Sequence, residues 1–257
     1  MRQGKEIVLD TLGQSSRDWI TTAEASYGLT DRFSLQATLP VISASFAGEA
    51  LGVDRSQTKL GDFSLAAHYF WSFGYFAAPV MLSLGAGVNF PTGGGIENPV
   101  SSDRNFVSGT LDPIITGSLV FSIQGPLSAS ASFYARPILS EADDGTKTGG
   151  FIFAGVGAGY SFIFSDNSGL DFSLRASGLH RAQDKINGQP FANSGGNWVY
   201  ITPGATVSLF GRGIHGLQLS TALEVPVYQY VKGSQLTEDW TLRFGLGYGF
   251  HLISGGG

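Results

Sequence analysis

The stretch from Trp240 to Leu252 alternates between large apolar residues and small or polar ones almost without exception. The apolar positions are Trp240, Leu242, Phe244, Leu246, Tyr248, Phe250 and Leu252, and between them stand Thr241, Arg243, Gly245, Gly247, Gly249 and His251. A period of two places successive side chains on opposite faces of a β-strand. In a membrane barrel the apolar face contacts lipid, and glycines suit a lumen with little room. The pattern therefore favours a transmembrane β-strand.

The composition points the same way. Glycine accounts for 37 of the 257 residues and charged residues for only 14%, against averages of about 7% and about 25%. Such a chain lacks the charge that keeps the surface of a soluble protein hydrated. Cysteine is absent, which excludes disulfides, thiolate metal sites and cysteine nucleophiles. The net charge of −5 and the lack of basic runs argue against a nucleic-acid partner, because phosphate binding needs clustered Lys and Arg.

Two stretches, residues 63–96 and 113–135, contain no Asp, Glu, Lys or Arg, and each is long enough for a transmembrane helix. Both contain residues that disfavour helices, with Pro79 and several glycines in the first and Gly125-Pro126 in the second. Two strands joined by a turn explain each stretch better than a helix does.

A period of two divides the chain into twelve strand-like segments. They span residues 5–12, 18–29, 33–45, 61–71, 79–91, 111–122, 127–139, 151–164, 170–181, 197–210, 217–228 and 240–252. The alternation is weakest in the first. We predict an all-β fold over residues 1–257, forming a single domain: a transmembrane antiparallel up-and-down β-barrel of about 12 strands.

Short and long connections between these segments alternate. The short ones are residues 30–32, 72–78, 123–126, 165–169 and 211–216, and the long polar ones are 48–60, 92–110, 140–150, 182–196 and 231–239. Bacterial outer-membrane barrels have short periplasmic turns and longer extracellular loops. We therefore expect a Gram-negative outer-membrane protein with both termini on the short-turn side. Residues 1–12 lack the apolar segment of a signal peptide, so we expect an exported chain whose signal has been removed.

Aromatic residues stand at outward positions beside the short turns. They are Tyr27, Phe33, Trp71, Phe121, Phe164, Phe172 and Phe250, and they predict an interfacial girdle in contact with outer-membrane lipid. The long loops carry acidic residues, namely Glu97, Asp103, Asp143, Asp144 and Asp184. These residues would either bridge lipopolysaccharide or divalent cations, or simply be solvated, and the second interpretation is the simpler one.

Several short motifs resemble the outer-membrane transporter family named after the meta-pathway of phenol degradation. The motifs are Tyr27-Gly28-Leu29-Thr30, Leu39-Pro40, Leu60 to Leu65, Leu84 to Gly93 and Ser108 to Pro113, within a resemblance that extends from about residue 18 onward. The resemblance implies a small outer-membrane barrel that transports aromatic or other small hydrophobic compounds. It implies no catalytic residue.

The inward positions of the predicted barrel include a set of titratable residues. The candidates for lining the lumen are Glu24, His68, Arg136, Asp171, Arg175, Glu224 and Arg243. Barrel closure would bring Glu24, Glu224 and Arg243 together, and Arg136 and Arg175 would flank the glycine-lined eighth segment. One hypothesis is that these charges oppose one another across a narrow, selective constriction. The alternative is that they are internal salt bridges that fill and stiffen the barrel.

The predicted function is therefore an outer-membrane channel or transporter, porin-like, for passive passage of small solutes, hydrophobic or aromatic ones among them. The alternative is a structural barrel with an occluded lumen that serves an oligomer or an assembly partner. An outer-membrane lipid-modifying enzyme is a third class. No Gly-x-Ser-x-Gly stands at a strand-to-helix turn, and four scattered histidines define no site. We predict no enzyme activity, no catalytic residue, no metal site and no cofactor.

Overall fold

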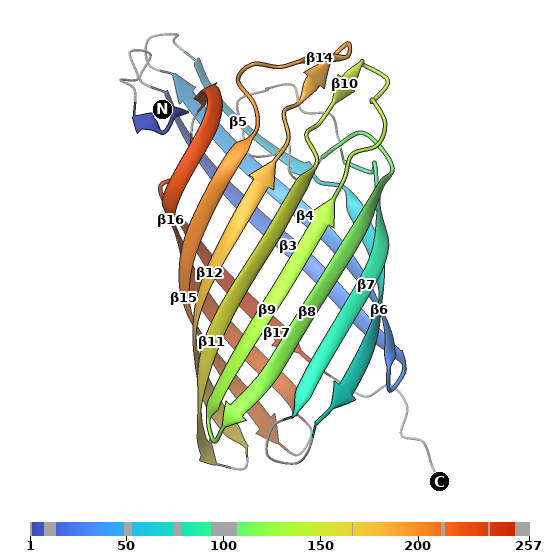
Figure 1. Cartoon of the computed structure of the whole chain (residues 1–257), viewed down its shortest axis with the longest axis vertical. Helices are drawn as coiled ribbons and strands as arrows, with labels where there is room; N and C mark the ends of the chain where they lie inside the picture. Colours follow the sequence, from blue (N-terminus) through green and yellow to red (C-terminus); the bar gives the residue numbers. More distant parts are fainter. Residues whose placement is uncertain are drawn as a thin grey trace.

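The computed structural model of the chain describes residues 2–7, 14–48, 53–74, 79–93, 107–165, 167–211, 214–235 and 237–249. The elements in these residues are β-strands joined by turns and loops (Figure 1). In this part of the chain no helix is long and apolar enough to cross a membrane. The strand interpretation of residues 63–96 and 113–135 is confirmed wherever those stretches are described.

Eleven strands correspond to the predicted segments from the second to the twelfth. They are β3 (Gln14–Thr30), β4 (Phe33–Gly48), β6 (Phe63–Phe73), β7 (Val80–Phe90), β8 (Asp112–Gln124), β9 (Leu127–Arg136), β11 (Phe151–Ser165), β12 (Ser168–Arg181), β15 (Gly196–Gly211), β16 (Ile214–Gln235) and β17 (Thr241–Tyr248). Each pairs antiparallel with its neighbours.

The strands form one sheet that curls nearly into a barrel. From β16 the order runs through β15, β12, β11, β9, β8, β7, β6 and β4 to β3, and β17 pairs with the other edge of β16. In Figure 1, strands β15 to β7 form the near wall, while β3, β4 and β17 lie behind them. The predicted all-β class with antiparallel, up-and-down strand order is confirmed.

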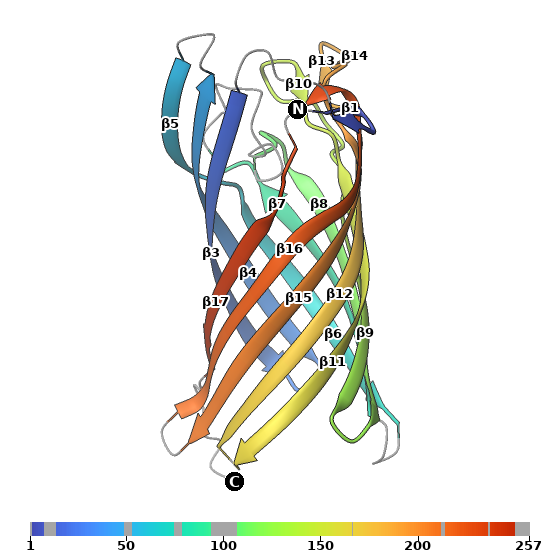
Figure 2. The same cartoon turned by 90° about the vertical axis from the view of Figure 1, so that its left-hand side faces the viewer.

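The two ends of the curled sheet, β3 and β17, are not joined by a ladder in the described residues. There β3 pairs with β4 and β17 pairs with β16. The first predicted segment, residues 5–12, would occupy this position, but residues 8–12 lie outside the described part of the chain. Glu6–Ile7 forms β2, which pairs with β1 (Arg2–Gly4), and β1 pairs with the end of β16 (Figure 2). These residues therefore lie at the long-loop end, and the expectation that both termini lie on the short-turn side was wrong for the amino-terminal one.

A second correction concerns the connection predicted over residues 48–60. Residues Val53–Leu60 form strand β5, which pairs with the upper half of β4 from Val41↔Leu60 to Gly48↔Val53. Most residues of this strand are polar on both faces, so it carries no apolar alternation. A strand without an apolar face leaves no alternation in the sequence from which it could be predicted.

Two of the long loops form a small sheet of their own. It consists of β10 (Thr146–Lys147), β13 (Lys185–Ile186) and β14 (Gln189–Pro190), which stand above the long-loop end of the main sheet (Figure 1).

The outer surface of the main sheet is apolar. Along β11, exposed residues alternate with half-buried ones from Phe151 to Ser161. Ile152 is 55% and Val156 61% exposed, although both are aliphatic. Of the predicted girdle residues, Tyr27, Trp71, Phe121, Phe164 and Phe172 are exposed, Phe33 is half-buried, and Phe250 lies outside the described residues. A surface of this kind is typical of strands that contact lipid.

Candidate functional site

The candidate residues occupy one face of the curled sheet. Partners in neighbouring antiparallel strands share a face, and Glu24 is linked in this way through Thr38 and Ser64 to buried Asn89. The same reasoning through the successive ladders places the other candidates on the concave face, namely His68, Arg136, Asp171, Arg175, Glu224 and Arg243. That these side chains contact a solute stays a prediction.

Glu224 on β16 and Arg243 on β17 form an ion pair. Nη2 of Arg243 lies 2.9 Å and 3.0 Å from the two carboxylate oxygens of Glu224. The Glu224 side chain is 12% exposed and that of Arg243 is 61% exposed. Glu24 makes no ion pair or hydrogen bond with either residue in the described structure, so only two of these three residues meet.

Arg175 on β12 reaches across the inner face of β11. Its Nη2 donates a hydrogen bond to Ser132 Oγ at 2.5 Å, and its guanidinium carbon lies 4.7 Å from the centre of the Phe153 ring. A Cβ atom added at Gly155 would lie 2.7 Å from Nε of Arg175, so a larger residue at that position would displace the arginine side chain. The charges of Glu224 and Arg243 act on Arg175 electrostatically.

Arg136 is packed against a stacked aromatic pair at the long-loop end. Its guanidinium carbon lies 5.1 Å from the centre of the Phe151 ring, and Phe151 stacks on Tyr134 with 5.5 Å between ring centres. The Arg136 side chain is 3% exposed and lies in the electrostatic field of Asp112 and Asp62. Arg136 and Arg175 thus flank β11, as predicted.

Asp62 is the centre of a buried hydrogen-bond cluster beside Arg136. Its carboxylate accepts hydrogen bonds from Asn89 Nδ2 at 2.9 Å, from the backbone N–H groups of Gly93 at 3.0 Å and Ser108 at 2.8 Å, and from Ser108 Oγ at 3.1 Å. Nearby, Thr110 Oγ1 donates to Asp112 at 2.7 Å. Asp62 is 2% and Asp112 0% exposed. The cluster therefore fixes both ends of the β7–β8 connection to the start of β6.

The motifs that carried the family resemblance converge on this cluster. Asp62 belongs to the motif Leu60 to Leu65, Asn89 and Gly93 to Leu84 to Gly93, and Ser108 to the motif Ser108 to Pro113. The buried Pro40 adds its carbonyl, which accepts a hydrogen bond from the N–H of Gly61 at 2.8 Å. Sequence reasoning quoted these motifs but did not place Asp62 or Asp112 among the site residues.

The remaining two candidates are His68 and Asp171. The His68 ring and the Thr116 side chain both lie close to Gly85, where an added Cβ atom would clash with each of them. Asp171 accepts a short hydrogen bond from Ser161 Oγ on the neighbouring strand. Neither residue makes an ion pair in the described structure.

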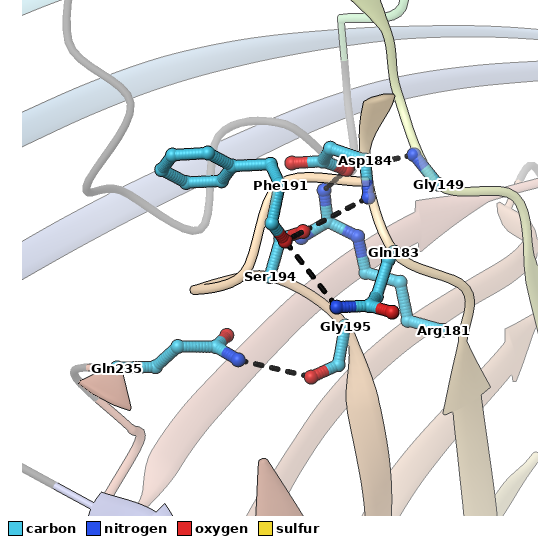
Figure 3. Close-up of polar contacts among 8 residues, drawn as sticks. All are labelled: Gly149, Arg181, Gln183, Asp184, Phe191, Ser194, Gly195 and Gln235. Carbon is cyan, nitrogen blue, oxygen red and sulfur yellow. Dashed lines mark hydrogen bonds and ion pairs between the residues drawn. The ribbon is translucent and has the colours of Figure 1, made fainter. Parts of the chain in front are cut away.

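A second buried aspartate ties the long loops to one another. Asp184 Oδ1 accepts hydrogen bonds from the Gly149 N–H at 2.7 Å and from Arg181 Nη2 at 2.9 Å, while the Asp184 N–H donates to Ser194 Oγ at 2.9 Å (Figure 3). From the end of β16, Gln235 Nε2 donates to the Gly195 carbonyl at 2.9 Å. Asp184 is 0% exposed, so its assignment to a solvated loop was wrong.

The sequence analysis named Asp184 but did not predict its burial, because one of its partners comes from a distant part of the chain. The Gly149 N–H lies 35 residues away and belongs to another loop. For the other acidic loop residues, Asp143 and Asp144 are exposed, whereas Glu97 and Asp103 lie outside the described residues. Among the residues with described positions, no three His, Cys, Asp or Glu side chains are grouped as a metal site would require.

The arrangement defines a class of fold: a curled antiparallel sheet, apolar outside, with charged and small residues on its concave face. The chain is similar to the crystal structure of the COG4313 outer membrane channel from Pseudomonas putida F1, with a TM-score of 0.61 and 16% sequence identity over 91% of this chain and 82% of that one. At this identity the similarity establishes the fold alone. No family model and no curated protein matches the sequence, so the resemblance to the phenol-degradation transporters is not confirmed.

Proposed function

We propose that the protein is an outer-membrane channel that lets small solutes pass through the interior of the curled sheet. The observation that carries the proposal is the charged inner face at mid-height, where Arg175 projects from β12 while Glu224 and Arg243 pair on β16 and β17. An inner face that served only to fill a barrel would be expected to be mostly apolar or fully paired. The similarity to a known channel structure supports this proposal.

The outer-membrane location rests on the apolar outer surface. Side chains such as Phe244 and Leu246 on β17 are 75% and 74% exposed, which would be costly in water over so many strands. An antiparallel barrel can satisfy its backbone groups in lipid, provided that its edges are paired. A Gram-negative outer membrane is the setting in which such barrels occur.

Charges of both signs lie near one another on this part of the inner face. Glu224 and Arg243 are close enough to Arg175 to interact with it electrostatically, and Glu238 interacts in the same way with Glu224, Arg243 and Asp18. A charged lining of this kind favours polarised solutes. The resemblance to aromatic-compound transporters supports small aromatic solutes among those that pass.

A structural barrel with an occluded interior is the second candidate. It is favoured by the tight packing of inner-face residues near the long-loop end, where Tyr200 is 5% and Arg136 3% exposed. In this alternative the arginines would stabilise the wall and no solute would pass.

Liposome uptake separates the two candidates. The purified protein is reconstituted in vesicles, and swelling is measured with a series of uncharged solutes of increasing size and with small aromatic compounds. The channel proposal predicts swelling that falls with solute size. Vesicles that respond like protein-free ones for every solute would support the occluded barrel instead.

A further inference from the structure

The outer face of strands β12, β15 and β16 changes in character along its height. From the short-turn end up to Val199 and Val225 the outward positions are almost all apolar, with Leu174 and Leu219 among the exposed ones. Closer to the long-loop end the outward residues of the three strands are His180, Asn197, Tyr228, Tyr230 and Lys232. A change from aliphatic residues to tyrosines and polar residues is typical of the level at which a membrane protein meets lipid headgroups.

The ladders place these residues in a row that continues onto the amino-terminal strand. His180 faces Asn197, and Asn197 faces Tyr230. On the other side of β16, β1 brings Lys5 alongside, and the Lys5 Nζ lies 5.5 Å from the centre of the Tyr228 ring. Figure 2 shows these strands side by side, with β1 at the upper end of β16. The row therefore extends from an exposed lysine on β1 to an exposed histidine on β12.

Lys232 adds a second exposed cation next to this row. It stands two residues beyond Tyr230 on β16, and its Nζ donates a hydrogen bond to the neutral side chain of Gln183, just after β12, at 3.3 Å. It makes no ion pair in the described structure. His180 is also accessible, because its Nδ1 contacts Asn197 Oδ1 at 2.7 Å and leaves Nε2 for a ligand.

Negative charge is lacking on the same surface. None of the outward residues described on β12, β15 and β16 is Asp or Glu. The aspartate of the adjoining loop, Asp184, is buried and paired with Arg181. The upper part of this outer wall therefore attracts anions.

We propose that Lys5, His180, Tyr228, Tyr230 and Lys232 form a binding surface for the phosphorylated headgroup of a glycolipid, the lipid A part of lipopolysaccharide. The inference rests on the proposed outer-membrane location and does not depend on the passage of solutes. The two lysines bind phosphate groups, the tyrosines lie at headgroup level, and Nε2 of His180 contacts headgroup hydroxyls or phosphates. The aliphatic residues below contact acyl chains.

The width of the surface favours a glycolipid over an ordinary phospholipid. Three spacings between neighbouring strands separate β1 from β12, which is about 14 Å. One phosphate cannot contact cations at both ends of such a row. A headgroup with two sugars and two phosphates is large enough to contact both.

The test is native mass spectrometry of the purified protein in detergent, titrated with lipid A that carries two phosphates. We expect a saturable one-to-one complex. Lys5→Gln combined with Lys232→Gln should weaken it about 25-fold, because each lysine at an anionic surface contributes a factor of about five. Lys232→Arg keeps the charge and should keep the affinity. Arg32→Gln removes an equal charge from the β3–β4 turn, at the opposite end of the sheet, and should leave the affinity unchanged.

Comparison lipids and a milder variant complete the test. Phosphatidylglycerol, with one phosphate, and lipid A without phosphates should both bind more weakly than lipid A. If the double variant fails to fold, Lys232→Gln alone should show a loss of about five-fold. The proposal would be overturned by the absence of a lipid A complex, by equal affinities for lipid A and phosphatidylglycerol, or by a lipid A affinity that the lysine substitutions do not change.

Lipid binding and solute passage fail separately. The substituted lysines lie on the outer face, so liposome uptake by the double variant should equal that of the original protein. A lipid A complex formed by a protein that takes up no solute would retain the binding surface and contradict the channel. Solute uptake without a lipid A complex would retain the channel and contradict the binding surface.

Discussion

Arg243 and Glu224 form a diagonal ion pair across the last ladder of the sheet. In the β16–β17 register Glu224 faces Thr241 and Arg243 faces Ala222, so the arginine reaches two pairs along the ladder, to the next pair on the same face, and brings Nη2 within 2.9 Å of a Glu224 oxygen. The pair joins a well-covered carboxylate to a guanidinium that is 61% exposed toward the interior. One charge of the pair therefore remains accessible on the concave face.

Neutralising either member of this pair should shift ion selectivity in opposite directions. Glu224→Gln leaves the Arg243 charge uncompensated and should favour anions, whereas Arg243→Gln should favour cations. A unit charge at contact distance is worth about 1 kcal/mol in water-like surroundings, or roughly a five-fold change in relative permeability. Reversal potentials in a salt gradient measure this. Shifts of the same sign would show that the pair does not face the permeation path.

The glycines of β11 should be needed for an open interior. Gly157→Leu places an isobutyl group on the inner face beside Ser130, where it reduces conductance and slows solute uptake. Ala158→Leu makes a similar addition at the neighbouring exposed position on the outer face, and conductance should be unchanged. Single-channel recordings compare the two. Equal conductance in both variants would contradict a path along β11.

Removal of the Asp62 carboxylate should destabilise the long-loop end. Asp62→Ala leaves the buried Asn89 amide and the backbone N–H groups of Gly93 and Ser108 without their acceptor. Each buried donor left unsatisfied costs about 1–3 kcal/mol, so we expect the free energy of unfolding to fall by about 3 kcal/mol. Urea unfolding in micelles, monitored by Trp fluorescence, measures the loss. Asp143→Ala, at an exposed loop position, is the matched control and should have no effect.

Loss of the Asp184 charge should loosen the contact between the two structured loops. Asp184→Asn removes the ion pair with Arg181, whose side chain is only 12% exposed. Breaking a buried pair from one side costs about 3–5 kcal/mol. Hydrogen exchange at the Gly149 amide should become faster, while amides in the middle of β11 keep their protection. Lys185→Gln, an exposed neighbour, should leave exchange at Gly149 unchanged. An unaltered Gly149 amide in Asp184→Asn would contradict this role.

The strands with an apolar outer face were predictable, because the alternation of large apolar residues with small or polar ones distinguishes their two faces. β11 and β12 begin and end within two residues of their predicted bounds. The alternation is lost where a strand has no apolar face, which is why β5 was predicted to be a loop and why β16 extends to Gln235, beyond its predicted end at Tyr228.

Contacts between residues along one ladder could also be predicted from the sequence, whereas contacts between loops could not. Parity and strand order brought Glu224 beside Arg243 and placed Arg136 and Arg175 around β11. The contact of Asp184 with Gly149 depends on how two loops fold against each other, and the periodicity of the sequence does not predict such a contact. Asp62 was only partly predictable. Its motif was recognised in the sequence, but its burial depends on Gly93 and Ser108, at the two ends of the β7–β8 connection, which both donate hydrogen bonds to it.

Single-channel recording in planar lipid bilayers tests the channel function most directly. The purified protein, inserted from detergent, should produce discrete conductance steps, and Gly157→Leu should lower their amplitude while Ala158→Leu does not. A bilayer that contains folded protein yet shows no conductance steps, together with liposomes that take up no solute, would contradict the channel and leave an occluded structural barrel.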